Sequence, residues 1–105
     1  MKEVLFVCSA GMLRSATAAH LAHREFEWNT RCAGIEPYAV QPIHQNTVEW
    51  AQLIFCMESK HFEFIKAHYP KNIQQRCVIL DIPDNFSYRD MELEAMLRNK
   101  LYDYV

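Results

Sequence analysis

A continuous apolar run at residues 4–7 limits what this chain can fold into. The run reads Val-Leu-Phe-Val and contains no polar residue. Such a run is typical of a strand that is covered on both faces, as in a parallel sheet flanked by helices. After a short loop, Ser15–Phe26 is rich in alanine and places Leu21, Ala22 and Phe26 on one helical face. The two segments predict a strand-loop-helix unit whose strand is central in the sheet.

The rest of the chain continues this alternation of apolar runs and amphipathic segments. We expect further strands at 29–32, 53–57 and 78–80, and helices at 43–51, 59–69 and 91–104. A polar loop at 81–90 precedes the last helix. The alternation predicts the α/β class and a single domain over residues 1–105. We expect three layers, with helices on both faces of a four-stranded parallel sheet and ligands bound beyond the carboxyl ends of the strands.

The loop after the first strand carries the strongest chemical signal. It runs from Cys8 to Arg14 and leads into the Ala-rich helix. Successive backbone N–H groups at a strand-to-helix turn can converge on an anion, and the helix dipole favours negative charge there. A thiol in this place should exist largely as the nucleophilic thiolate. Arg14 offers a planar fork for two phosphoryl oxygens, and Ser15 can donate to the sulfur. The predicted phosphate-binding residues are Ser9, Ala10, Gly11, Met12, Leu13, Arg14 and Ser15.

This pattern resembles the low-molecular-weight protein tyrosine phosphatase family. The main motif is V-C-x-x-x-x-x-R-S at residues 7–15, and Ala33-Gly34, Leu53-Ile54-Phe55, Met57-Glu58 and Ile82-Pro83-Asp84 support it. The resemblance spans nearly the whole chain. It implies a metal-free, cofactor-free hydrolysis of phosphate monoesters through a phosphocysteine, with a phosphorylated protein or a small aryl phosphate as the substrate.

The resemblance also implies roles for individual residues. Cys8 would be the nucleophile, Arg14 the oxyanion clamp and Asp84 the general acid and base. Asp81 and Asp90 lie in the same loop and are alternatives for the acid, because Asn85 follows Asp84 where the family has proline. The candidates for an aromatic substrate rim are Tyr38, Phe86 and Tyr88.

Two departures from the family pattern concern the bracing of the loop. Gly11 stands where the family has asparagine, and Cys32 stands where it has serine. Those two side chains hold the family's loop through a mutual hydrogen bond. Glycine adopts a left-handed conformation without steric cost, so we expect a loop that keeps its shape but is less rigid. The segment at 35–52 is also shorter than in the family, which predicts a truncated rim.

Other functions remain open on the sequence. The run from Cys8 to Met12 also resembles the cysteine-phosphorylated B component of sugar phosphotransferase systems, which relays phosphate, although Arg14 and Asp84 argue against it. A catalytically weak module that binds an anion or a protein is a further alternative. Arsenate reductase chemistry is disfavoured, because Cys56 and Cys77 lie in or beside predicted strands.

Charge and composition exclude several other classes of protein. The net charge is −2 and the basic residues are scattered, so we expect no nucleic-acid partner. The apolar N-terminal run is too short for a membrane span or a secretory segment, which predicts a cytoplasmic protein without a membrane partner. No histidine or cysteine spacing indicates a metal site.

Overall fold

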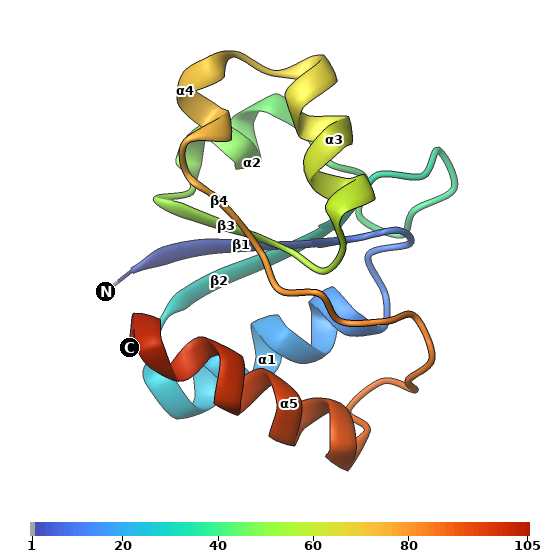
Figure 1. Ribbon diagram of the computed structural model, residues 1–105, viewed down its shortest axis with the longest axis vertical. Coiled ribbons are helices and arrows are strands. Elements are labelled where there is room, and N and C mark those ends of the chain that lie inside the picture. The colour runs from blue at the N-terminus through green and yellow to red at the C-terminus, as the bar shows by residue number, and fades with distance from the viewer. Residues whose placement is uncertain (1) are drawn as a thin grey trace.

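Four parallel strands form the centre of the computed structural model, which describes residues 2–105. The strands are β1 (Glu3–Cys8), β2 (Asn29–Gly34), β3 (Leu53–Cys56) and β4 (Cys77–Ile79). Their order across the sheet is β2-β1-β3-β4, so β1 lies in the interior as expected. The expected α/β architecture is confirmed (Figure 1).

Helices cover both faces of this sheet (Figure 1). One face carries α1 (Arg14–Phe26) and α5 (Met91–Leu101), and a 3₁₀ turn at Tyr102–Tyr104 follows α5. The other face carries α2 (Gln45–Trp50), α3 (Ser59–His68) and α4 (Lys71–Gln74). Among residues 2–105, none of the helices has the length and apolar composition needed to cross a membrane.

Side chains alternate between two apolar cores on either side of the sheet. Val4, Phe6 and Cys8 of β1 join the core under α1 and α5. Leu5 and Val7 join the core under the other three helices. Both faces of β1 are therefore buried, which explains the unbroken apolar run in the sequence and anchors Cys8 firmly at the end of the strand.

The predicted and observed elements differ mainly at the helices of the second face. The helix expected from residue 43 begins at Gln45, because the side chain of His44 accepts a hydrogen bond from the Asn46 N–H and caps it. Pro70 ends α3 as expected, but it also precedes α4, which was not predicted from the sequence. A four-residue helix is too short to show an amphipathic period.

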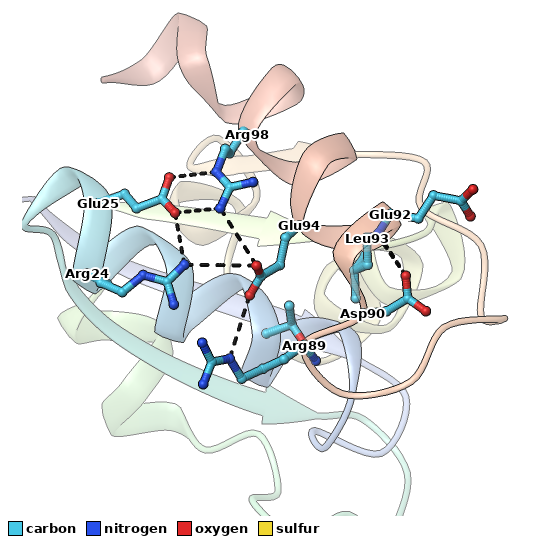
Figure 2. A network of polar contacts seen from close by, with 9 residues as sticks. Arg24, Glu25, Arg89, Asp90, Glu92, Leu93, Glu94 and Arg98 are labelled. Atoms are coloured by element: carbon cyan, nitrogen blue, oxygen red, sulfur yellow. Dashed lines mark hydrogen bonds and ion pairs between the residues drawn. The ribbon is translucent and has the colours of Figure 1, made fainter.

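Ion pairs connect α1 to α5 and hold the segment before α5 in place (Figure 2). Arg98 binds Glu25 through two nitrogens at 2.7 and 2.6 Å. Hydrogen bonds from Arg98 and then Arg24 lower the pKa of Glu25 to about 2. Asp90 caps the N-terminus of α5, and the Arg89 N–H donates to Thr17 Oγ1 of α1 at 2.8 Å. The loop that contains Asp84 is thus fixed at its far end.

Candidate active site

The segment from Cys8 to Arg14 forms a tight loop between β1 and α1. The Cys8 sulfur lies 2.9 Å from Ser15 Oγ and accepts a hydrogen bond from the Gly11 N–H at 3.2 Å. The predicted contact between Ser15 and the sulfur is therefore present. Leu13 caps α1 without a side-chain hydrogen bond, which leaves the first-turn N–H groups without a side-chain acceptor. This is a favourable electrostatic setting for an anion.

The only two glycines of the sequence meet where this loop packs on β2. Gly11 has a φ of +70°, the left-handed conformation that the sequence predicted. A Cβ on Gly11 would lie 2.9 Å from Gly34 N, and a Cβ on Gly34 would lie 2.6 Å from Gly11 N. The two backbones approach so closely that neither position has room for a side chain.

Backbone hydrogen bonds brace the loop where the side-chain bracing of the family pattern is missing. The N–H groups of Ile35, Glu36 and Val40 donate to the carbonyls of Cys8, Ser9 and Ala10 at 3.0–3.1 Å. The Cys32 sulfur, in contrast, lies 4.0 Å from the Gly11 carbonyl oxygen. Backbone hydrogen bonds from the segment after β2 therefore support the loop in this chain.

Arg14 is buried at the bottom of the site, with 1% of its surface exposed. Its Nη1 donates to Glu58 Oε2 at 2.5 Å and to the Ile82 carbonyl at 2.7 Å. Its Nε lies 3.6 Å from Asp84 Oδ1 and has no hydrogen-bond partner among residues 2–105. One side of the guanidinium is thus anchored, and its Nε donor is free to bind another acceptor.

Two residues at the start of α3 complete the site, and neither was assigned a role from the sequence. Burial opposes ionisation of Glu58, but the hydrogen bond and charge of Arg14 outweigh it and lower the pKa of the carboxyl. His61 is fully buried. Burial, reinforced by the Arg14 charge, lowers its pKa to about 4, so His61 is neutral at physiological pH. A carboxylate that pairs with Arg14 and an uncharged imidazole thus lie beside the loop.

A small cavity of about 90 Å³ opens at the loop. It has room for about three water molecules or one phosphoryl group. Its lining includes all three residues expected to be catalytic and the candidate rim residue Tyr38. The full lining is Cys8, Ser9, Ala10, Leu13, Arg14, Tyr38 and Asp84. The site therefore combines a thiol, a guanidinium and a carboxylate around a space that matches one oxyanion.

The remaining candidates lie outside this cavity. Asp90 is the cap of α5. Asp81 lines a larger cavity of about 840 Å³ between β4 and α5, and no residue from Cys8 to Arg14 lines that cavity. Phe86 packs against the core under α1 and α5. Tyr88 lines a neighbouring groove with Met12 and Leu13. Of the three aspartates in the 81–90 loop, Asp84 alone lines the cavity beside Cys8.

Solved structures with the same fold are numerous, although no protein-family model and no curated protein sequence matches the chain. The low-molecular-weight protein tyrosine phosphatase from T. tengcongensis superposes with a TM-score of 0.81 at 16% identity, covering 100% of both chains. The YwlE arginine phosphatase from Geobacillus stearothermophilus gives 0.79 at 20% identity, covering 99% of this chain and 92% of that one.

The tyrosine phosphatase Wzb from Escherichia coli K30, solved in complex with phosphate, gives a TM-score of 0.80 at 15% identity. The match covers 98% of this chain and 95% of Wzb. The chain therefore has the fold of the low-molecular-weight protein tyrosine phosphatases, as the sequence motifs predicted.

Proposed function

We propose that this protein is a cysteine-dependent phosphatase that hydrolyses phosphate monoesters through a phosphocysteine intermediate. The observation that carries the proposal is the arrangement around Cys8: the sulfur accepts the Gly11 N–H, and the same cavity is lined by the buried Arg14 and by Asp84. We assign Cys8 as the nucleophile, Arg14 as the oxyanion clamp and Asp84 as the proton donor around one phosphoryl-sized space.

The first chemical step transfers the phosphoryl group to the enzyme. The Cys8 thiolate attacks phosphorus, an S–P bond forms, and the bond to the leaving oxygen breaks. Asp84, in its protonated form, gives its proton to that oxygen. The Arg14 Nε–H and the N–H groups of the loop stabilise the charge on the three remaining phosphoryl oxygens.

The second step returns the enzyme to its starting state. The Asp84 carboxylate accepts a proton from a water molecule as that water attacks phosphorus. The S–P bond breaks, inorganic phosphate leaves, and the Cys8 thiolate and protonated Asp84 are restored. Asp84 is suited to both steps because its side chain is 55% exposed to water and lines the same cavity as Cys8.

We assign the substrate to phosphotyrosine in a protein, or to a small aryl phosphate. Leu13 and Tyr38 line the cavity beside the polar groups, and Tyr38 is 73% exposed. The apolar edge at Leu13 favours a phenyl ring over a charged guanidinium, whereas Tyr38 can stack on either group. Tyrosine phosphatases and an arginine phosphatase share this fold, so phosphoarginine is the substrate to compare directly.

We place the reaction in the cytoplasm. The four cysteines are free thiols, and a reducing compartment keeps the Cys8 nucleophile active. No nucleic acid or membrane is assigned as a partner, in keeping with the weakly negative net charge of −2.

Steady-state hydrolysis of p-nitrophenyl phosphate tests the proposed activity. The expected result is turnover that Cys8→Ser abolishes and that the half-buried Cys77→Ser leaves intact. A stable phosphocysteine without turnover would favour a phosphate relay instead. Tight phosphate binding without phosphocysteine or turnover would favour a binding module.

The general acid is identified by how strongly the effect of its removal depends on the leaving group of the substrate. Asp84→Asn is expected to lower kcat/KM, which covers the steps up to the first phosphoryl transfer, about 10²-fold or more with phenyl phosphate, a poor leaving group, and less with p-nitrophenyl phosphate. Asp81→Asn is the matched control, because asparagine tolerates the positive φ of 56° at that position. An equal loss of kcat/KM with both substrates would remove Asp84 from the role of acid in the first step.

A further inference from the structure

His61 connects two parts of the site that lie far apart in the sequence. Its Nδ1 accepts the backbone N–H of Glu58 at 2.9 Å. Its Nε2 lies 3.1 Å from the hydroxyl oxygen of Ser9 in the catalytic loop. The imidazole therefore joins the first turn of α3 to the loop that is proposed to hold the phosphoryl group.

The hydrogen-bond pattern fixes the tautomer of this imidazole. A backbone N–H can only donate, so Nδ1 of His61 must be the unprotonated acceptor. The ring proton of the neutral form then lies on Nε2, which donates to Ser9 Oγ. The Ser9 hydroxyl accepts this bond and keeps its own hydrogen for another acceptor. Because Ser9 lines the cavity, we take a phosphoryl oxygen bound there to be that acceptor.

The charged groups around His61 affect its protonation and connect it to Arg14. Arg14 and Lys60 oppose its protonation, whereas Glu58 and Asp84 favour it, and burial keeps the ring neutral. The residue that binds Nδ1 through its N–H is Glu58, whose carboxylate in turn binds Arg14 at 2.5 Å. One imidazole thus contacts Ser9, which is proposed to bind phosphate, and Glu58, which supports Arg14.

We propose that His61 is a positioning residue, which orients the Ser9 hydroxyl toward the phosphoryl group and fixes Glu58 so that Arg14 is held in its clamping position. This inference rests on the proposed phosphatase function and goes beyond it. His61 touches no reacting atom, and it acts only through Ser9 and Glu58. Its removal should therefore lower the rate of phosphoryl transfer without unfolding the site.

Two substitutions of His61 form a matched pair for the test. Asparagine offers Oδ1 in place of Nδ1 and can still accept the Glu58 N–H, but it is too short to reach Ser9. His61 is the third residue of α3, and glutamine at this position of a helix commonly accepts the N–H of the capping residue, here Glu58. Its longer side-chain amide can also reach Ser9. The two variants should have similar melting temperatures and differ in their contact with the loop.

The expected result with p-nitrophenyl phosphate is a kcat for His61→Asn that is about 10- to 100-fold below the wild-type value, with KM nearly unchanged. His61→Gln should stay within about threefold of the wild type. Combining His61→Asn with Ser9→Ala should add little to the loss caused by Ser9→Ala alone, because both remove the same contact. Equal kcat values for the asparagine and glutamine variants, or fully additive losses, would overturn the proposal.

Orthovanadate binding separates this inference from the phosphatase proposal. If the wild type hydrolyses no phosphate ester, the proposed function fails. The affinity of the loop for vanadate, measured by calorimetry, still tests the role of His61. His61→Asn should then bind vanadate about tenfold more weakly than His61→Gln. Equal affinities would show that His61 does not position the loop.

Discussion

Replacing Arg14 with lysine would keep the buried positive charge but remove the planar fork. Arg14 Nη1 already binds two acceptors, Glu58 and the Ile82 carbonyl, and the free Nε remains for the phosphoryl group. Lysine has a single nitrogen, which cannot occupy both places. Because Glu58 and the carbonyl are fixed in the resting site, the lysine nitrogen should bind them and leave the phosphoryl oxygens without this donor.

The size of the effect follows from losing one donor that acts in the transition state. Removal of such a donor costs about 3–4 kcal/mol, which corresponds to about 10²- to 10³-fold in kcat. Arg14→Lys should therefore lower kcat with p-nitrophenyl phosphate by this factor, while circular dichroism shows a folded protein. The matched control is Arg98→Lys, which alters an exposed pair with Glu25 far from the cavity and should leave kcat within about twofold. A loss of less than tenfold in Arg14→Lys would refute the role assigned to the fork.

Three further predictions concern stability, measured by urea unfolding. Gly11→Ala should lower the free energy of unfolding by about 1–3 kcal/mol, because φ is +70° and the new Cβ would press on Gly34 N; a neutral change would contradict the close packing of the two backbones. The folded pKa of His61, about 4, lies below its unfolded value near 6.5, so its contribution is complete above pH 6.5 and about 3 kcal/mol is lost as the pH falls to 4. His61→Asn should show a shallower acid slope, and an unchanged slope would count against this assignment. Glu25→Gln should cost less than about 1 kcal/mol at pH 7, because its pairs with Arg24 and Arg98 are solvent-exposed; a loss above 2 kcal/mol would contradict this.

The parts of the fold that were predictable are those encoded in short stretches of sequence. Examples are the unbroken apolar runs of β1 and β3 and the motif from Cys8 to Ser15. Each of these is recognised from residues that are adjacent in the sequence. The family resemblance pointed to Asp84 but left Asp81 and Asp90 open, and the fold shows that Asp84 is the one of the three that lines the cavity beside Cys8. The fold class and the position of the cavity could therefore be predicted from the amino-acid sequence alone.

The parts that could not be predicted depend on contacts between distant segments. Glu58 binds a residue 44 positions away, and His61 binds one 52 positions away. Histidines in an amphipathic helix are most often packed or solvated, so the position of His61 in the sequence indicated no special role. The presence of only two glycines indicated that each has a structural role. That role is their mutual contact, which can be recognised only from the register of β1 and β2.

The central claim is that one phosphoryl group is held at Cys8 between Arg14 and Asp84. A crystal structure of the wild-type protein soaked in orthovanadate tests it most directly. The expected result is a vanadium atom bonded to the Cys8 sulfur, with equatorial oxygens bound by loop N–H groups and Arg14 Nε, and the apical oxygen facing Asp84. Vanadate bound elsewhere, or bound at the loop with Asp84 turned away from the apical oxygen, would contradict the account.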